Sequence, residues 1–264
     1  MLETLRLLAG SLLLRPYVFA FLGVHLAGAG ALLGWRRTAA FTLLTWGAAF
    51  AAEASSIRTG IPFGWYYYVP ATTGRELWIA GVPFFDSISF PFLLVSSYGL
   101  AWWLLSGGDA AERRARPRRM AHQLLATALF VLADVVIDPV ALRGDRWFLG
   151  RIYGYPEPGL YFGIPAANFL GWGAVGLAAT GLYHVWERRQ PALSVAAFRG
   201  RAWLCPGLYF VVLGFALTVT FAVQEWWLGL CGVVLTLPVV AMTLRAGAGS
   251  GALGVTPRGE GAAP

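Results

Sequence analysis

The stretch ADVVIDPVALRGDRWFLGRIYGYPEPGLYFGIPAANFLGW (Ala133–Trp172) decides the fold and the search for a site. It starts at the end of an apolar run that carries two acids, Asp134 and Asp138. An aromatic, glycine-rich loop follows, and a second apolar run opens after Gly163 and carries Asn168. Acids inside a bilayer are costly and therefore indicate function. Because the two acids are four residues apart, they share one helix face, where we expect chemistry.

The composition predicts a membrane protein. The chain has 264 residues, of which 58% are hydrophobic and only 12% are charged, whereas a soluble domain has roughly 25% charged residues. Several apolar runs reach the ~18–20 residues that a membrane-spanning helix needs. We therefore predict an all-α, polytopic transmembrane helical bundle, and composition argues against a soluble helical domain.

The apolar runs predict about seven spans in a single transmembrane domain, residues 1–245. The spans are expected near residues 16–34, 38–55, 83–105, 121–141, 161–186, 203–222 and 226–244. The Gly/Ala-rich segment 246–264 is expected to be a disordered tail.

Arginine distribution predicts the orientation in the membrane. The net charge is +7, and all 20 basic residues are Arg. Many occupy alternate loops and the tail: Arg36, Arg37, Arg113, Arg114, Arg116, Arg118, Arg119, Arg188, Arg189, Arg199, Arg201, Arg245 and Arg258. This alternation predicts one cytoplasmic side, with the N-terminus outside and the C-terminus inside the cell, and not a nucleic-acid partner.

That topology brings the polar groups of separate helices to one depth. The non-cytoplasmic half is expected to hold Glu53, Asp86, Asp134, Asp138, Asn168 and Glu225. A weak internal repeat supports the grouping, because Glu53 precedes Gly81-Val82-Pro83 at nearly the spacing at which Asp134 precedes Gly163-Ile164-Pro165. Two helix–loop–helix units of this kind could face each other across a cavity, although apolar segments can also resemble one another by chance.

Each polar group also has a structural explanation. The acid pair could end a helix at the interface, and Glu53 could pair with Arg58. Asp86 could cap the helix that follows it, and Asn168 could join two helices. Glu225 resembles an interfacial turn beside two tryptophans.

Aromatic residues gather in both acid-bearing loops, where they could form an interfacial belt or line a slot for a flat apolar ligand. The set comprises Trp65, Tyr66, Tyr67, Tyr68, Tyr153, Tyr155, Tyr161 and Trp172. Cys205 and Cys231 fall in different predicted helices near opposite membrane faces, which argues against a disulfide. No metal-ligand spacing, phosphate loop or dinucleotide fingerprint occurs, so we predict no metal and no cofactor.

Two blocks of the sequence carry a family resemblance. The first block runs from Glu53 to Gly81-Val82-Pro83 and includes Arg58-Thr59-Gly60-Ile61-Pro62-Phe63-Gly64. The second block comprises Asp134, Asp138-Pro139, Tyr153-Gly154 and the segment from Tyr161 to Trp172. Together they resemble the integral-membrane carotenoid biosynthesis family that includes carotenoid hydratases of bacteria and archaea, which implies a bacterial or archaeal cytoplasmic membrane. The resemblance covers roughly residues 40–185. Asp86-Ser87-Ile88-Ser89 is more polar than the family leads us to expect, which points to a different substrate or outcome.

The resemblance implies a hydro-lyase that adds water to the terminal double bond of an acyclic carotenoid, such as lycopene or a derivative, in membrane lipid. Such chemistry needs an acid that protonates carbon and a site that stabilises the cation. We expect Asp134 or Asp138 to be the donor, while the other acid or Glu53 stays ionised. Asn168 and Tyr153 would orient water. Substrate would contact Asp86 and the aromatic residues Trp65, Tyr66, Tyr67, Tyr68, Tyr161 and Trp172.

Two other functions fit the same pattern. A cyclase or isomerase would form the same cation and exclude water. A non-catalytic carotenoid or lipid carrier, or a small transporter, would also show a repeat and polar groups within the membrane. The sequence leaves the oligomeric state open.

Overall fold

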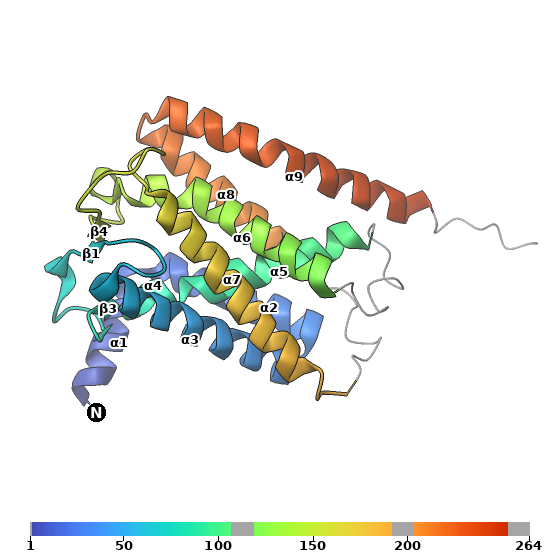
Figure 1. Cartoon of the computed structure of the whole chain (residues 1–264), viewed down its shortest axis with the longest axis horizontal. Coiled ribbons are helices and arrows are strands. Elements are labelled where there is room, and N and C mark those ends of the chain that lie inside the picture. The colour runs from blue at the N-terminus through green and yellow to red at the C-terminus, as the bar shows by residue number, and fades with distance from the viewer. Residues whose placement is uncertain (1, 107–118, 192–202, 253–264) are drawn as a thin grey trace, which may run out of the picture.

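The chain forms a bundle of long helices with a small layer of loops and short strands at one end (Figure 1). The computed structural model describes residues 2–106, 119–191 and 203–252. The helices are α1 (Leu2–Leu14), α2 (Pro16–Leu33), α3 (Trp35–Thr59), α4 (Phe84–Ser87), α5 (Ser89–Leu105), α6 (Arg119–Ala141), α7 (Ala166–Glu187), α8 (Leu204–Ala222) and α9 (Trp226–Ala252). Short elements are β1 (Tyr67–Tyr68), β2 (Trp78–Ile79), β3 (Val82–Pro83), β4 (Tyr153–Gly154) and the 3₁₀ turns Pro70–Thr72 and Gly144–Arg146.

A long helix lies at each of the seven predicted spans, but only some of these helices are apolar enough to cross a membrane. Within the described residues, five segments meet that condition: α2, α4 with α5, α6, α8 and α9. α3 falls short because it carries Arg36, Arg37, Glu53 and Arg58 among its threonines and serines. α7 is rich in glycine and alanine, which are only weakly apolar. A count of seven spans therefore stays a prediction.

Helix boundaries differ from the predicted ones where the backbone turns. The span predicted at 83–105 is divided into α4 and α5. α7 begins at Ala166 rather than at 161, because Tyr161 and Ile164 pair across a tight turn before it. α9 continues to Ala252, into the predicted tail. The remainder of that tail and the arginines at 113, 114, 116, 118, 199, 201 and 258 lie outside the described residues.

The most buried helix is α5, which contacts α2, α3, α6, α8 and α9. Its contact with α8 is close: a Cβ added at Gly99 would lie 2.6 Å from the Cβ of Cys205. Small residues at helix crossings are typical of membrane bundles. Cys205 and Cys231 are both free, as predicted.

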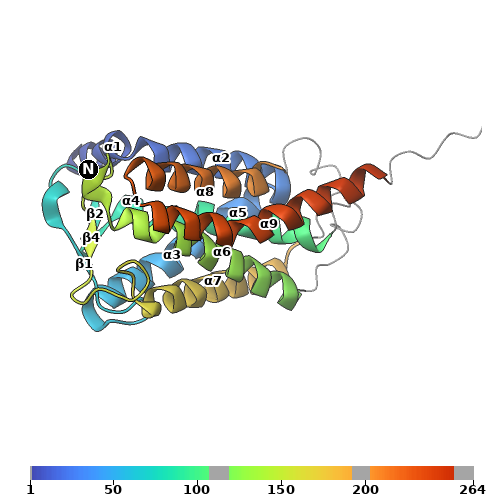
Figure 2. The ribbon, with the colours of Figure 1, turned by 90° about the horizontal axis from the view of Figure 1, so that it is seen from above.

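Two loops far apart in the sequence form one layer at the same end of the bundle (Figures 1 and 2). β1 pairs with β4 in antiparallel register, with Tyr67 opposite Gly154 and Tyr68 opposite Tyr153. The pairing ties the loop after α3 to the loop after α6. It thereby brings aromatic residues of the two acid-bearing halves, Tyr68 and Tyr153, next to each other.

The two halves share a turn. Ala80 and Gly81 both have positive φ, at 49° and 83°, and Phe162 and Gly163 repeat this at 50° and 94°. Each turn leads to a proline at the N-cap position of the next helix, Pro83 before α4 and Pro165 before α7. The correspondence is local, and the internal repeat as a whole stays a prediction.

Candidate functional site

Asp134 and Asp138 are joined by the side-chain amide of Asn168. The amide nitrogen of Asn168 lies 2.9 Å from Oδ2 of Asp134 and 3.0 Å from Oδ2 of Asp138. α6 presents both acids on one face, and the first turn of α7 brings Asn168 opposite them. Asp134 is 1% exposed and Asn168 is 5% exposed. Asp134, Asp138 and Asn168, which the sequence places at one depth, thus form a single buried cluster.

Tyr153 and Tyr155 supply two further donors to Asp138. The Tyr153 hydroxyl donates to Oδ1 of Asp138 at 2.5 Å, and the Tyr155 hydroxyl donates to Oδ2 at 3.2 Å. Burial raises the pKa of both phenols above its usual range, and the neighbouring Asp138 carboxyl raises it further. The phenols therefore remain neutral donors, and the Asp138 carboxyl group accepts hydrogen bonds from three side chains.

The first half of the chain contributes Asp86 and Glu53. The Tyr68 hydroxyl donates to Oδ2 of Asp86 at 2.5 Å, and the Tyr66 hydroxyl lies 3.4 Å from that of Tyr68. Asp86 lies within α4, and its side chain caps neither α4 nor α5, so the capping alternative is wrong.

Glu53 is 3% exposed, and its Oε2 makes no hydrogen bond within the described part of the chain. The alternative that Glu53 pairs with Arg58 is also wrong. Arg58 donates instead to the carbonyls of Ala54 and Ala80.

These groups line a polar cavity of about 60 Å³. Its walls come from both halves of the chain: Glu53, Phe63, Tyr66, Tyr68, Asp86, Ser89, Phe90, Asp138, Tyr153, Tyr155, Asn168 and Trp172. Phe90 and Trp172 stack at 4.2 Å between ring centroids. Phenol, carboxyl and amide groups thus face the same cavity, which is suited to holding water.

A second, largely apolar cavity of about 130 Å³ adjoins the first. The two cavities share Asp86, Ser89, Asp138, Tyr153 and Trp172, and Asp134 lines only the apolar one. Most of the other walls are aliphatic or aromatic, among them Tyr17, Phe21, Phe85, Phe92, Ile137, Trp147, Val212 and Phe215. Asp138 and Asp86 therefore lie at a boundary between polar and apolar space.

Three of the predicted substrate-binding residues lie outside both cavities. Trp65 and Tyr67 are 58% and 43% exposed. Successive side chains of an extended segment point to opposite sides, so Tyr66 and Tyr68 face the cavity while Trp65 and Tyr67 face away. Tyr161 lines a separate pocket beside Val135 and Phe169. We therefore exclude these three from the candidate site.

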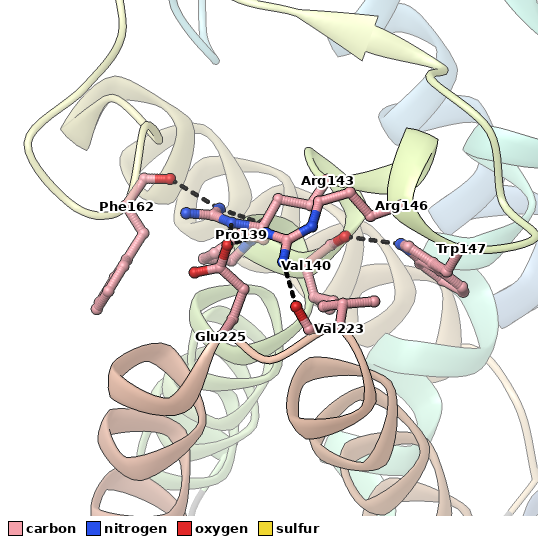
Figure 3. A network of polar contacts seen from close by, with 8 residues as sticks. All are labelled: Pro139, Val140, Arg143, Arg146, Trp147, Phe162, Val223 and Glu225. Atoms are coloured by element: carbon pink, nitrogen blue, oxygen red, sulfur yellow. Dashed lines mark hydrogen bonds and ion pairs between the residues drawn. The ribbon is translucent and has the colours of Figure 1, made fainter.

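Glu225, which was predicted at the depth of the other acids, belongs to a structural network (Figure 3). Its Oε1 lies 2.8 Å from Nε of Arg143 and also accepts a hydrogen bond from Arg146. Burial opposes its ionisation, but the hydrogen bonds and charges of the two arginines hold its pKa below the usual range. Arg143 also donates to the Pro139 and Phe162 carbonyls. This network holds the end of α6 against the turn before α9.

Several walls of the site were not predicted. Tyr155 was noted in the sequence only as a loop aromatic, yet it bonds Asp138. Ser89 ends the polar segment 86–89 that departs from the family pattern, and Phe90 follows it, so that departure was a usable signal. The apolar walls from α2 and α8 carry no motif, because an apolar residue in an apolar helix gives no sign of which neighbour it faces.

The close approach of Gly171 to the cavity wall gives a stability prediction. A Cβ at Gly171 would lie 2.3 Å from Cδ1 and 2.9 Å from Cα of Phe63, whereas one at Gly173 would be 3.8 Å from Val131. Gly171→Ala should therefore destabilise the protein by about 1–3 kcal/mol through overpacking. Gly173→Ala, on the same helix, should be neutral or stabilising, since alanine favours helix by up to about 1 kcal/mol. Thermal unfolding in detergent compares them, and equal midpoints would contradict this packing.

No three His, Cys, Asp or Glu side chains converge as metal ligands in residues 2–106, 119–191 and 203–252. The cluster itself offers carboxyl, amide and phenol groups beside an apolar chamber.

Comparison with known proteins identifies the family. Residues 8–239 match the family described as carotenoid biosynthesis protein. Comparison with curated proteins and with solved structures finds no match. The match covers most of the chain and includes every residue of the acid cluster. The protein therefore belongs to the carotenoid biosynthesis protein family.

Proposed function

We propose that the protein is a cofactor-independent hydratase that adds water to the terminal C=C of an acyclic carotenoid end group. The observation that carries this proposal is the position of Asp138, in the wall between a polar cavity and an apolar one. A hydrocarbon end group in the apolar cavity and a water molecule in the polar cavity can therefore both reach Asp138. The family supplies the substrate class, since a carotenoid biosynthesis protein acts on a long isoprenoid hydrocarbon.

Asp134 is the proposed proton donor, because it faces only the apolar cavity. The π electrons of the terminal double bond take its proton at the less substituted carbon, where a C–H bond forms. The positive charge is left on the tertiary carbon, and Asp134 becomes a carboxylate. Carbon is a poor base, so the step depends on stabilising the cation.

Two features of the site stabilise that cation. Asp138 accepts hydrogen bonds from Tyr153, Tyr155 and Asn168, which favour its ionised form. A fixed negative charge beside the developing positive charge lowers the barrier. The Trp172 ring, which lines both cavities, can present its face to the cation.

Water from the polar cavity completes the reaction. Its oxygen forms the C–O bond to the tertiary carbon, and one of its protons passes to the Asp138 carboxylate. The product is a tertiary alcohol. Transfer of one proton from Asp138 to Asp134, which share the Asn168 amide, restores the starting state. Glu53, with Oε2 buried and unpartnered within the described residues, is a second group that can hold water in this cavity.

Liquid chromatography with mass spectrometry, after expression in a lycopene-producing host, tests the proposal. A new, more polar pigment heavier by one water is expected. A new pigment of unchanged mass would show cyclisation or isomerisation instead. A pigment profile unchanged by well-expressed protein, with lycopene and with its acyclic derivatives, would contradict catalysis and favour a carrier.

We further propose that the protein lies in a bacterial or archaeal cytoplasmic membrane, on the family resemblance, with its C-terminus in the cytoplasm, on the arginine distribution. The site then lies in the non-cytoplasmic half of the bilayer. The five helices that are long and apolar enough to cross a membrane support a membrane location.

A further inference from the structure

We infer that the apolar cavity is the binding site for the terminal segment of a linear polyene, which reaches it sideways from the lipid between α2 and α8. The inference rests on the proposed function for the identity of the ligand. Its geometry comes from the cavity walls.

The inner end of the apolar cavity is closed and chemically active. Its deep walls include Phe85, Val140, Trp172 and Ala216, each no more than 8% exposed. Asp134 and Asp138 lie in the same wall. A chain that is inserted end first therefore stops with its terminal double bond against the acids.

The outer end reaches the side of the bundle that α2 and α8 form. Tyr17 and Phe21 on α2 and Phe215 on α8 line the cavity there and are only half-buried. Tyr17 stacks on Phe215 at 5.8 Å between ring centroids, and Phe21 meets the same ring edge-on at 6.0 Å. The cavity thus passes from a buried acid end to a partly exposed aromatic rim.

That rim lies on helices that can face lipid. α2 and α8 contact each other and are both among the segments able to cross a membrane (Figure 2). Val211, one turn before Phe215 on α8, is 58% exposed and lines neither cavity. A long hydrocarbon partitions into the bilayer rather than into water. Access from the lipid side therefore needs no aqueous step.

The rim is tested with Phe215→Gln and the matched control Val211→Gln, which place the same amide one turn apart on one helix. Full-length protein in lipid nanodiscs is incubated with lycopene, and the amount of pigment that remains bound after purification is measured. Phe215→Gln should weaken binding about tenfold, because an amide replaces an apolar contact of the polyene. Val211→Gln should bind like the wild type. Equal binding by the two variants would overturn the inference.

A second measurement separates this inference from the proposed function. A short acyclic terpenoid that carries the same terminal double bond fills only the inner end of the cavity, so Phe215→Gln should leave its binding unchanged. If Phe215→Gln weakened the binding of the short terpenoid and of lycopene equally, the substitution would have a general structural effect, and the lateral path would be overturned. Wild-type protein that binds lycopene but never hydrates it would contradict the hydratase while leaving the path intact.

Discussion

Asp134→Asn is expected to abolish conversion of the carotenoid, whereas Asp138→Asn is expected to change the product. Without Asp134 there is no proton to form the cation, so turnover should fall by about 10³-fold or more, near the upper range for general acid catalysis. Without the Asp138 carboxylate the cation still forms, more slowly, but water is no longer activated. The cation then loses a proton, and a pigment of unchanged mass results.

Deuterated water distinguishes the two acids. In the wild type, deuterium should appear on the carbon next to the one that carries the new hydroxyl group. The Asp138→Asn variant should yield deuterated pigment without added water, and Asp134→Asn should leave the pigment unlabelled. The reverse pattern would assign the donor role to Asp138.

Asp145→Asn is the matched control for this pair. Asp145 is exposed and lies in the 3₁₀ turn that follows α6, close in sequence to both acids. The substitution makes the same change of carboxyl to amide and should leave the rate and the product as in the wild type. Expression and thermal unfolding of all three variants, measured in detergent, show whether a loss of activity reflects a loss of folded protein.

The position of the acids was predictable because helix periodicity and the order of the apolar runs are properties of the sequence. Asp134 and Asp138 are one turn apart, and Asn168 begins the next long helix, so a hairpin of helices must bring them together. Which aromatic residues join them depends on strand pairing. β1 pairs with β4 across a long separation in the chain, and its register selects Tyr68 and Tyr153 while leaving Tyr67 outside.

The number of spans and the apolar cavity show where sequence reasoning ends. Residues 38–55 and 161–186 were predicted as spans, yet α3 carries charge and α7 is rich in small residues, and the two pack against each other. Hydropathy does not say whether such a helix faces lipid or protein. It also does not say that Tyr17 meets Phe215, since that contact depends on how α2 crosses α8.

Asn168→Ala is expected to lower kcat by about 10²-fold with little change in KM, because the amide contacts the two acids. A hydrogen bond to a charged group is worth about 1.5–3 kcal/mol, and this amide makes one to each carboxyl. Without the Asn168 amide, transfer of the proton from Asp138 back to Asp134 should slow, and both acid side chains should be free to rotate. The fraction of pigment that leaves without added water should rise as Asp138 loses its alignment.

Thr180→Ala is the matched control for that variant. Thr180 is also buried on α7, but its hydroxyl bonds only to carbonyls of its own helix among the described residues. Both substitutions remove a buried polar side chain from one helix, so a purely structural effect should appear in both. A kcat reduced equally by the two changes would show that Asn168 merely packs α7. A loss confined to Asn168→Ala, with KM retained, would instead identify the amide as the group that holds the two acids in register.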